Sequence, residues 1–398
     1  MASLSGRIIK MLLVAFTFLI VLSLSLSLLS QYRGLSLTPY SVTSGAKNGL
    51  SDLKNILETQ GFETKIIVTD PEAIISIKRN MVYTIIGPSL TYDTQAAFTI
   101  LSILQNGSSI LLVDDFGRIN SLLRAIYDMI SPTDLVRSIL GGDLGPDTSI
   151  TDASIIFNTT AVVLDAGAYW KNPAYITIKN FNDYGGVLKH NIRSVLAKFA
   201  SALMLDMTLK FKNNNTVKRV IMPLPSNIGF MVTTPFSWLE TNLKSAIDGK
   251  ATPDPNEWGG IPFSIALAFE IPGGGRMMLI GDPDIFTNDV LDIAKTKGFD
   301  NEEFIVDIFE WLAEPTGSNL IVFDESRKAL TPDNPLFGVT IPMKIIASFI
   351  RYWIIAPLLP ITFILFAVSY LPRRFKREIK IFKPTTKKTG TSPYYGRY

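Results

Sequence analysis

The hydrophobic and polar positions of this chain form two different patterns. Near each end lies a long stretch without a charged residue, 19 residues at 11–29 and 20 residues at 352–371. Each stretch is long enough to cross the hydrocarbon layer of a bilayer as an α-helix. Between them, short apolar runs alternate with amphipathic segments. We therefore expect transmembrane helices at 11–30 and 345–371, with a folded region at 36–335 between them.

Within the folded region, apolar runs of strand length alternate with segments of helical periodicity. Predicted strands cover 62–68, 81–86, 109–113, 276–280 and 320–323, and helices are expected after Leu50, Thr91, Asn288 and Asp300. The strands are apolar throughout, which is typical of a parallel sheet that helices cover on both faces. The predicted fold class is therefore α/β. The span from about 132 to 260 is less regular and carries several strand-like runs and one helical pattern at 191–204, so we expect a β-rich insertion there.

Acidic residues follow two of the predicted strands at the point where each strand ends. Asp114 and Asp115 come directly after 109–113, and Asp282 and Asp284 come shortly after 276–280. If both strands end at one edge of a parallel sheet, these carboxylates line a common site, which would suit a divalent cation or a polyol. The alternative is that aspartates at strand exits make turns and cap helices. We favour the turn and capping roles over metal binding, and no metal or other cofactor is assigned.

A serine nucleophile is a further candidate at the same edge. Ser89 follows Gly87 and Pro88 at the end of the strand 81–86, but the G-x-S-x-G elbow is absent. The sole histidine, His190, would have to complete a triad with Ser89 and Asp282. We expect instead that His190 is a surface residue, and we keep Ser89 as a candidate ligand-binding residue.

Charge is distributed unevenly along the chain. The net charge is +3, but the tail after residue 371 holds nine basic residues and one acid, and the region between the apolar stretches is near −8. Basic residues mark the cytoplasmic side of a membrane segment. Both the N-terminus (1–10) and the tail (372–398) are thus predicted to be cytoplasmic, and the folded region extracytoplasmic. The tail residues expected to contact lipid or a cytoplasmic partner are Arg373, Arg374, Lys376, Arg377 and Lys380.

Composition removes several function classes. The chain has no cysteine, which excludes disulfides, thiolate metal sites and a cysteine nucleophile. The acidic outer region makes nucleic-acid binding an unsuitable role for it. Three N-x-T or N-x-S sequons, at Asn106, Asn158 and Asn214, are compatible with a glycosylated outer face. The first apolar stretch is longer than a usual signal-peptide core and no clear cleavage site follows it, which favours a signal anchor over a cleaved signal peptide.

The order of several short motifs resembles a known family. They are Gly49-Leu50 with Leu53, Gly61-Phe62-Glu63, Ile86-Gly87-Pro88, Val113-Asp114-Asp115-Phe116-Gly117, Thr233-Thr234-Pro235 with Trp238, and Ile280-Gly281-Asp282-Pro283-Asp284. Over residues 40–315 this order resembles an uncharacterised family of membrane proteins with a class I glutamine-amidotransferase-like ectodomain. It is similar, more distantly, to the auxiliary component of gliding-type ABC transporters.

The resemblance implies a flavodoxin-like ectodomain between membrane helices. It also implies partners of the kind found beside such proteins, namely MoxR-type AAA ATPases and von Willebrand-type proteins. Amidotransferase chemistry needs a cysteine, which this chain lacks. The function expected from the sequence is therefore a membrane-anchored, non-catalytic binding or scaffold protein. The alternative is an extracytoplasmic hydrolase, directed for example at glycans, with Asp114 and Asp282 as acid and base.

Overall fold

The computed structural model divides the chain into two compact units, residues 32–337 and the terminal parts Met1–Gln31 with Gly338–Tyr398. It describes residues 38–68, 71–130, 148–211, 216–271 and 274–328, together with six single positions between 14 and 25. Among these residues no helix combines the length and the apolar character needed to cross a membrane. The predicted helix at 345–371, the basic tail and most of the predicted helix at 11–30 lie outside the described residues.

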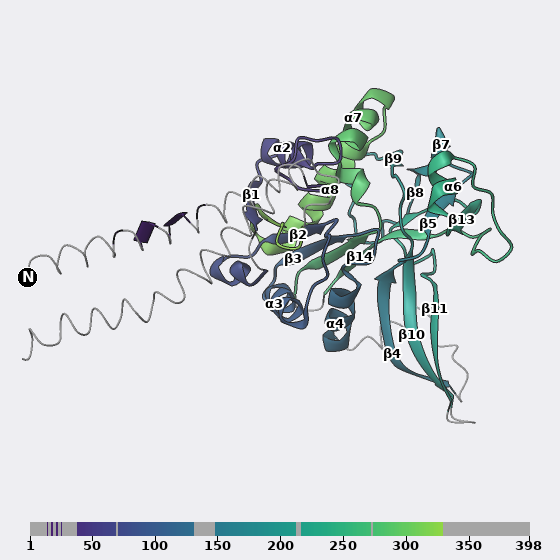
Figure 1. The fold of residues 1–398 in the computed structure, drawn as a ribbon, viewed down its shortest axis with the longest axis horizontal. Coiled ribbons are helices and arrows are strands. Elements are labelled where there is room, and N and C mark those ends of the chain that lie inside the picture. Colours follow the sequence, from purple (N-terminus) through teal and green to yellow (C-terminus); the bar gives the residue numbers. More distant parts are fainter. Residues whose placement is uncertain are drawn as a thin grey trace, which may run out of the picture. The chain divides into compact units, whose positions relative to one another are not determined.

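An eight-stranded sheet runs through the unit 32–337 (Figure 1). Its strands in spatial order are β1 (Glu63–Ile67), β16 (Leu320–Asp324), β2 (Val82–Ile86), β3 (Ser109–Val113), β15 (Arg276–Ile280), β14 (Ser264–Glu270), β12 (Met231–Val232) and β8 (Asn180–Phe181). The first five strands pair in parallel and the last three are antiparallel. The prediction of an α/β fold with a mostly parallel sheet is thus confirmed. If the five parallel strands are numbered in chain order, their spatial order in the sheet is 1-5-2-3-4. The flavodoxin fold has the spatial order 2-1-3-4-5.

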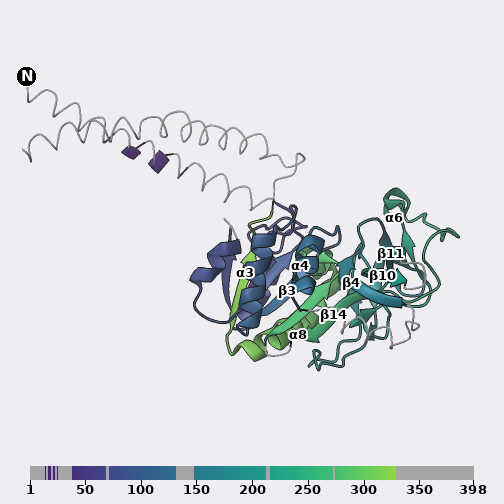
Figure 2. The same cartoon turned by 90° about the horizontal axis from the view of Figure 1, so that it is seen from below.

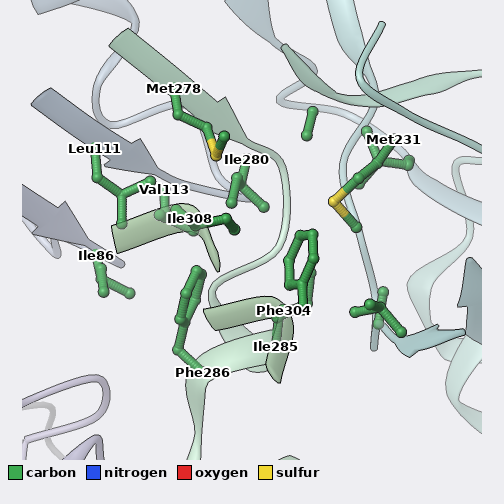
Figure 3. Close-up of a cluster of buried hydrophobic side chains, with 14 of the residues drawn as sticks. Ile86, Leu111, Val113, Met231, Met278, Ile280, Ile285, Phe286, Phe304 and Ile308 are labelled. Carbon is green, nitrogen blue, oxygen red and sulfur yellow. The ribbon is translucent and has the colours of Figure 1, made fainter. Parts of the chain in front are cut away.

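Helices cover both faces of the parallel strands (Figure 2). On one face lie α3 (Thr94–Gln105) and α4 (Asn120–Ile130), and on the other α2 (Ser51–Thr59), α7 (Asn288–Lys297) and α8 (Asn301–Ala313). Alternate residues of β3 enter the two cores: Ile110 and Leu112 pack on the α3 and α4 side, Leu111 and Val113 on the α8 side. Figure 3 shows the core on the α8 side of the sheet, where Phe304 and Ile308 of α8 face Leu111 and Val113. Burial on both sides explains why the strands are apolar at every position.

The span between α4 and β14 is rich in strands in the part that the structure describes. A three-stranded antiparallel sheet contains β4 (Thr148–Phe157), β10 (Leu203–Phe211) and β11 (Thr216–Pro223). Smaller sheets pair β5 (Val162–Asp165) with β13 (Ser237–Glu240), and β7 (Asn172–Ile178) with β6 (Tyr169–Trp170) and β9 (Val195–Leu196). The short helix α6 (Leu243–Asp248) and the 3-10 turns Pro71–Ser76, Pro283–Phe286 and Glu314–Thr316 complete the described elements.

The helix predicted at 191–204 is wrong. The segment forms β9 and the start of β10, with an extended connection between them. Its backbone is held from outside, because the Lys198 N–H donates to Asp282 Oδ2 at 2.5 Å and the Ser201 N–H donates to the Gly281 carbonyl at 2.6 Å. Phe199 also has a positive φ of 58°, which no α-helix contains. Tertiary hydrogen bonds therefore override the helical spacing of the apolar residues.

Candidate functional site

The acidic residues lie where the path of the chain changes face. β3 and β15 are parallel neighbours, with Val113 paired to Ile280. After β3 the chain continues into α4 on one face of the sheet, and after β15 it continues into α7 on the other. In open α/β sheets, ligands bind outside the carboxyl ends of the strands at such a switch point. Asp114 and Asp115 follow β3 here, and Asp282 and Asp284 follow β15, so the structure brings the four predicted aspartates to one place.

Two of these aspartates hold the backbone. The Asp114 carboxylate accepts hydrogen bonds from the Phe116 N–H (3.0 Å) and the Ile119 N–H (2.7 Å). The Asp282 carboxylate accepts from the Asp284 N–H (2.8 Å) and the Lys198 N–H (2.5 Å). Both side chains are fully buried. For this pair, the interpretation as turn-forming and capping residues holds.

Burial dominates the electrostatics of these two carboxyls. It raises the pKa of Asp114 to about 6, and hydrogen bonds from backbone N–H groups oppose the rise. Burial also raises the pKa of Asp282, with the neighbouring charge of Asp284 adding to it. Both effects disfavour the ionised form that the backbone donors stabilise.

Asp115 differs from its neighbour. Its Oδ1 atom is buried and has no hydrogen-bond partner among the described residues. Burial raises the pKa of this carboxyl well above its usual value, and the charges of Asp114 and Asp284 raise it further. Because almost all buried polar atoms in folded proteins are paired, an unpaired carboxylate oxygen at a switch point is a candidate for ligand contact.

Two residues that the sequence did not predict complete the site. The Tyr40 hydroxyl donates to Asp284 Oδ1 at 3.0 Å. The Lys198 ammonium lies 3.4 Å from Asp289 Oδ2 and 5.5 Å from the centre of the Tyr175 ring. We call Tyr40, Asp114, Asp115, Lys198, Asp282 and Asp284 the switch-point cluster.

The protonation states of Tyr40, Asp284 and Lys198 follow from their surroundings. Burial raises the pKa of Tyr40, as do the nearby carboxylates, so its hydroxyl remains a donor. Burial raises the pKa of Asp284 as well, whereas Lys198 and Tyr40 oppose the rise. Burial alone would lower the pKa of Lys198, but the charge of Asp284 and the contacts with Tyr175 and Asp289 raise it overall.

Strained backbone accompanies the cluster. Tyr40 has a positive φ of 57°, which is uncommon for a bulky residue and costs of the order of 1 kcal/mol or more. Gly87, at the end of β2, leaves the space for its ring, because a Cβ atom on Gly87 would lie 2.3 Å from Tyr40 Cδ2. Such backbone strain concentrates at ligand sites. No sequence pattern marks Tyr40, whereas Lys198 could have been noticed as a single charge inside the apolar run 195–204.

The other predicted candidates lie in different surroundings. The backbone N–H of Ser89 donates to the Arg327 carbonyl at 3.0 Å, and no hydrogen bond in the described residues joins Ser89 to the aspartates. His190 Nδ1 lies 2.6 Å from Asp307 Oδ1, and the imidazole is about half exposed. A triad of Ser89, His190 and Asp282 is therefore not assembled, because His190 pairs with Asp307 and Asp282 is occupied by backbone donors.

The described residues contain no group of three or more His, Cys, Asp or Glu side chains with an arrangement that could hold a metal ion. At the switch point, the carboxylate oxygens of Asp114 and Asp282 are already engaged by backbone N–H groups. The chemistry that remains is hydrogen bonding and charge pairing by Asp115, Asp284, Tyr40 and Lys198.

Comparisons with known proteins give little further information. No protein-family model matches the chain. No curated protein matches it either. Among solved structures it is similar to a chain described as the mmIFT52 N-terminal domain, with a TM-score of 0.41 and 12% sequence identity over 66% of this chain and 89% of that chain. A similarity at this level carries no argument about function.

Proposed function

We propose that this chain is a non-catalytic binding protein of a membrane complex, in which helices at 11–30 and 345–371 anchor an extracytoplasmic α/β unit. The two uncharged stretches, the basic tail after the second one and the motif order that resembles the amidotransferase-like membrane family support this proposal. The α/β unit recognises a ligand or protein at the switch-point cluster. The tail engages anionic lipid or a cytoplasmic protein such as a MoxR-type ATPase or an associated von Willebrand-type protein.

The observation that carries the binding role is the unpaired, buried oxygen of Asp115. A buried polar atom without a partner lowers stability by about 1–3 kcal/mol, and no hydrogen bond within the described residues offsets this loss. A ligand that donates a hydrogen bond or carries a positive charge would supply the missing partner. Tyr40, Asp284 and Lys198 would surround such a ligand with a hydroxyl, a second carboxylate and an ammonium.

The alternative is a hydrolase that uses carboxylates as acid and base. Asp114 and Asp282 are unsuited to these roles, because each is fully buried and accepts two backbone hydrogen bonds. A general acid or base must reach the substrate within hydrogen-bond distance. The raised pKa of Asp115 beside Asp284 favours acid catalysis, and it makes Asp115 the residue on which both functions are tested.

The test is co-purification from the native membrane in mild detergent. Three variants are compared with the full-length chain: Asp115→Asn, a chain that ends at Leu371, and the control Asp292→Asn on the exposed face of α7. We expect one partner or ligand to be lost with Asp115→Asn and retained with Asp292→Asn. A cytoplasmic partner should be lost with the shortened chain only.

Two outcomes contradict the proposal. If the same molecules are retained by all three variants, neither the switch-point cluster nor the tail binds a partner. If the purified chain hydrolyses a glycan substrate and Asp115→Asn abolishes turnover while the protein stays folded, the chain is an enzyme and Asp115 is its acid or base.

A further inference from the structure

A second hollow lies in the β-rich region, apart from the switch-point cluster. It encloses about 290 Å³, and segments from β4, β10, β11, β13 and the loop 251–258 contribute to it. The lining residues are Ile156, Phe157, Asn158, Thr159, Thr160, Ala161, Met204, Ile221, Leu239, Thr241, Asn256, Glu257 and Trp258. The volume is at the lower end of the range for small-molecule pockets, which suits a ligand of one ring.

The lining has a definite chemical character. Its floor is apolar, formed among others by Ile156, Met204 and Leu239, and its rim carries hydroxyl, amide and carboxylate groups. Among the described residues that line it, none is lysine or arginine, and Glu257 is the only charged one. An anionic ligand would therefore meet repulsion without a compensating cation. A neutral ligand with both an apolar face and hydroxyl groups matches this lining.

Asn158 provides a donor that the fold does not use. Its side chain is 8% exposed, and its Oδ1 accepts hydrogen bonds from Thr160 N–H (2.9 Å) and Thr160 Oγ1 (3.0 Å). The backbone is fixed as well, since its N–H donates to Ala202 and its carbonyl accepts from Ser201 Oγ. The amide nitrogen of Asn158 has no hydrogen-bond partner in the described part of the chain.

Glu257 provides an acceptor that is held in place. Its Oε1 accepts hydrogen bonds from both the N–H and the hydroxyl of Thr241, each at 3.0 Å. Its Oε2 accepts from the Asp254 N–H at 3.3 Å, which leaves further acceptor capacity on a carboxylate. Pre-organised acceptors of this kind lose little freedom when a ligand hydroxyl binds.

Trp258 provides an aromatic surface on the rim. Half of the residue is exposed, while its carbonyl accepts the Leu239 N–H at 2.8 Å and the next residue, Gly259, bridges to Trp238. The indole is thus attached to a strand-like segment and is partly open to solvent. Aromatic side chains combine a large apolar contact area with few rotatable bonds, which suits them to bind the C–H face of a ring.

We infer that this hollow, the Asn158–Trp258 pocket, binds a single neutral sugar ring, with Trp258 against its apolar face, Glu257 accepting from its hydroxyls and the Asn158 amide donating to them. The inference is independent of the proposed function, because none of the lining residues belongs to the switch-point cluster.

The test uses the full-length chain in a detergent without a sugar headgroup, so that the detergent cannot occupy the pocket. The probes are the methyl pyranosides of glucose, galactose, mannose and N-acetylglucosamine, observed by saturation-transfer difference NMR. For a ligand of this size we expect a Kd of about 1 mM for at least one probe. The variants are Trp258→Ala and Glu257→Gln, with the exposed residues Phe236→Ala and Glu302→Gln as matched controls outside the pocket.

We expect Trp258→Ala to abolish the signal and Glu257→Gln to weaken binding about tenfold, because a charged acceptor makes a stronger hydrogen bond than a neutral one. Both controls should bind as the unchanged chain does. The inference is overturned if no pyranoside binds at ten times that Kd, or if binding survives Trp258→Ala. It is also overturned if cyclohexanol, a ring of similar size with one hydroxyl, binds more tightly than every pyranoside.

Discussion

Asp114 and Asp115 are adjacent in the sequence, yet their carboxylates meet different surroundings. The first accepts two backbone hydrogen bonds inside the fold, and the second keeps a buried oxygen unpaired. Both are aspartates that follow β3, Asp114 as the first residue after the strand and Asp115 as the second. The difference arises from which backbone N–H groups the turn after β3 directs at each side chain. Roles at this site are therefore assigned residue by residue.

The capping role of Asp114 and Asp282 predicts a loss of stability when either is replaced. Asp114→Ala leaves the Phe116 and Ile119 N–H groups without their acceptor, and Asp282→Ala does the same for Asp284 and Lys198. We expect each change to lower the free energy of unfolding by about 2–4 kcal/mol, measured by chemical denaturation. Asp292→Ala on the exposed side of α7 is the control. Losses below about 0.5 kcal/mol for both aspartates would exclude the capping role.

His190 predicts a pH dependence that can be observed directly, because it is the only histidine in the chain. The hydrogen bond to Asp307, and then the charge of Asp307, raise the pKa of His190 above 6.5. The pair therefore contributes its full stability below about pH 6.5 and loses it as the pH rises through the folded-state pKa. An NMR titration of the single imidazole should give a pKa above 6.5 that falls in Asp307→Asn. An unchanged pKa in that variant would show that Asp307 is not the cause.

At the scale of elements, the sequence predicted the strands of the parallel sheet best. The runs at 109–113 and 276–280 coincide with β3 and β15, because strands buried on both faces must be apolar at each position. Helix starts depend more on tertiary contacts. The helix expected after Thr91 begins at Thr94, with Asp93 as its cap. The helix expected after Asp300 begins at Asn301, but the Asp300 side chain accepts hydrogen bonds from the backbone of Arg193 and Ser194 instead of capping it. Several residues can satisfy a helix start, and tertiary contacts decide between them.

The candidate site was predictable to the same extent. The four aspartates could be assigned to one edge, since parallel strands end on the same side of a sheet. Tyr40 and Lys198 could not be assigned to that edge from the sequence, because both come from connecting segments whose path depends on tertiary hydrogen bonds. The error at 191–204 has the same origin, since that segment lies against the loop after β15.

The close approach of the loop after β15 to the segment around Ser201 predicts that a side chain at Gly281 destabilises the fold. A Cβ atom on Gly281 would lie 2.0 Å from the Ser201 carbonyl oxygen, which is backbone and cannot rotate away. We expect Gly281→Ala to lower the free energy of unfolding by about 2–3 kcal/mol, measured by thermal or chemical unfolding. Gly45→Ala is the matched control, because no atom lies within 4 Å of its Cβ position. Equal stability of the two variants would contradict the contact.

At the scale of the whole unit 32–337, its first and last described segments are tied together. The Val42 N–H donates to Glu325 Oε1 at 3.0 Å, and the Lys328 ammonium lies 3.1 Å from the same oxygen. The side chains of Lys328 and Glu325 are 2% and 0% exposed, respectively. Tyr40, two residues before Val42, reaches the switch-point cluster. The first and last described segments of the unit thus meet at the sheet edge that carries the candidate site.

This connection predicts a large effect at Glu325. Glu325→Ala leaves the Lys328 ammonium buried without its partner and removes the acceptor of Val42. Breaking a buried ion pair from one side costs about 3–5 kcal/mol, and we expect a loss of that size in equilibrium unfolding. Glu302→Ala on the exposed surface of α8 should change stability little. If Glu325→Ala is equally mild, the two segments are not held by this pair.

The measurement that tests the account most directly is the free energy of unfolding of Asp115→Asn against the unchanged chain, from about pH 4 to pH 8. Because the folded-state pKa of Asp115 is raised, the unchanged chain should lose stability as the pH rises from the unfolded-state value near 4 through the folded-state value. Asparagine carries no charge, so the variant should be about as stable at pH 4 and more stable at pH 8. That result is expected of a residue kept for binding rather than for folding. A variant less stable than the unchanged chain by about 1 kcal/mol or more at neutral pH would show that Asp115 supports the fold, and would contradict its role as the ligand-contacting residue.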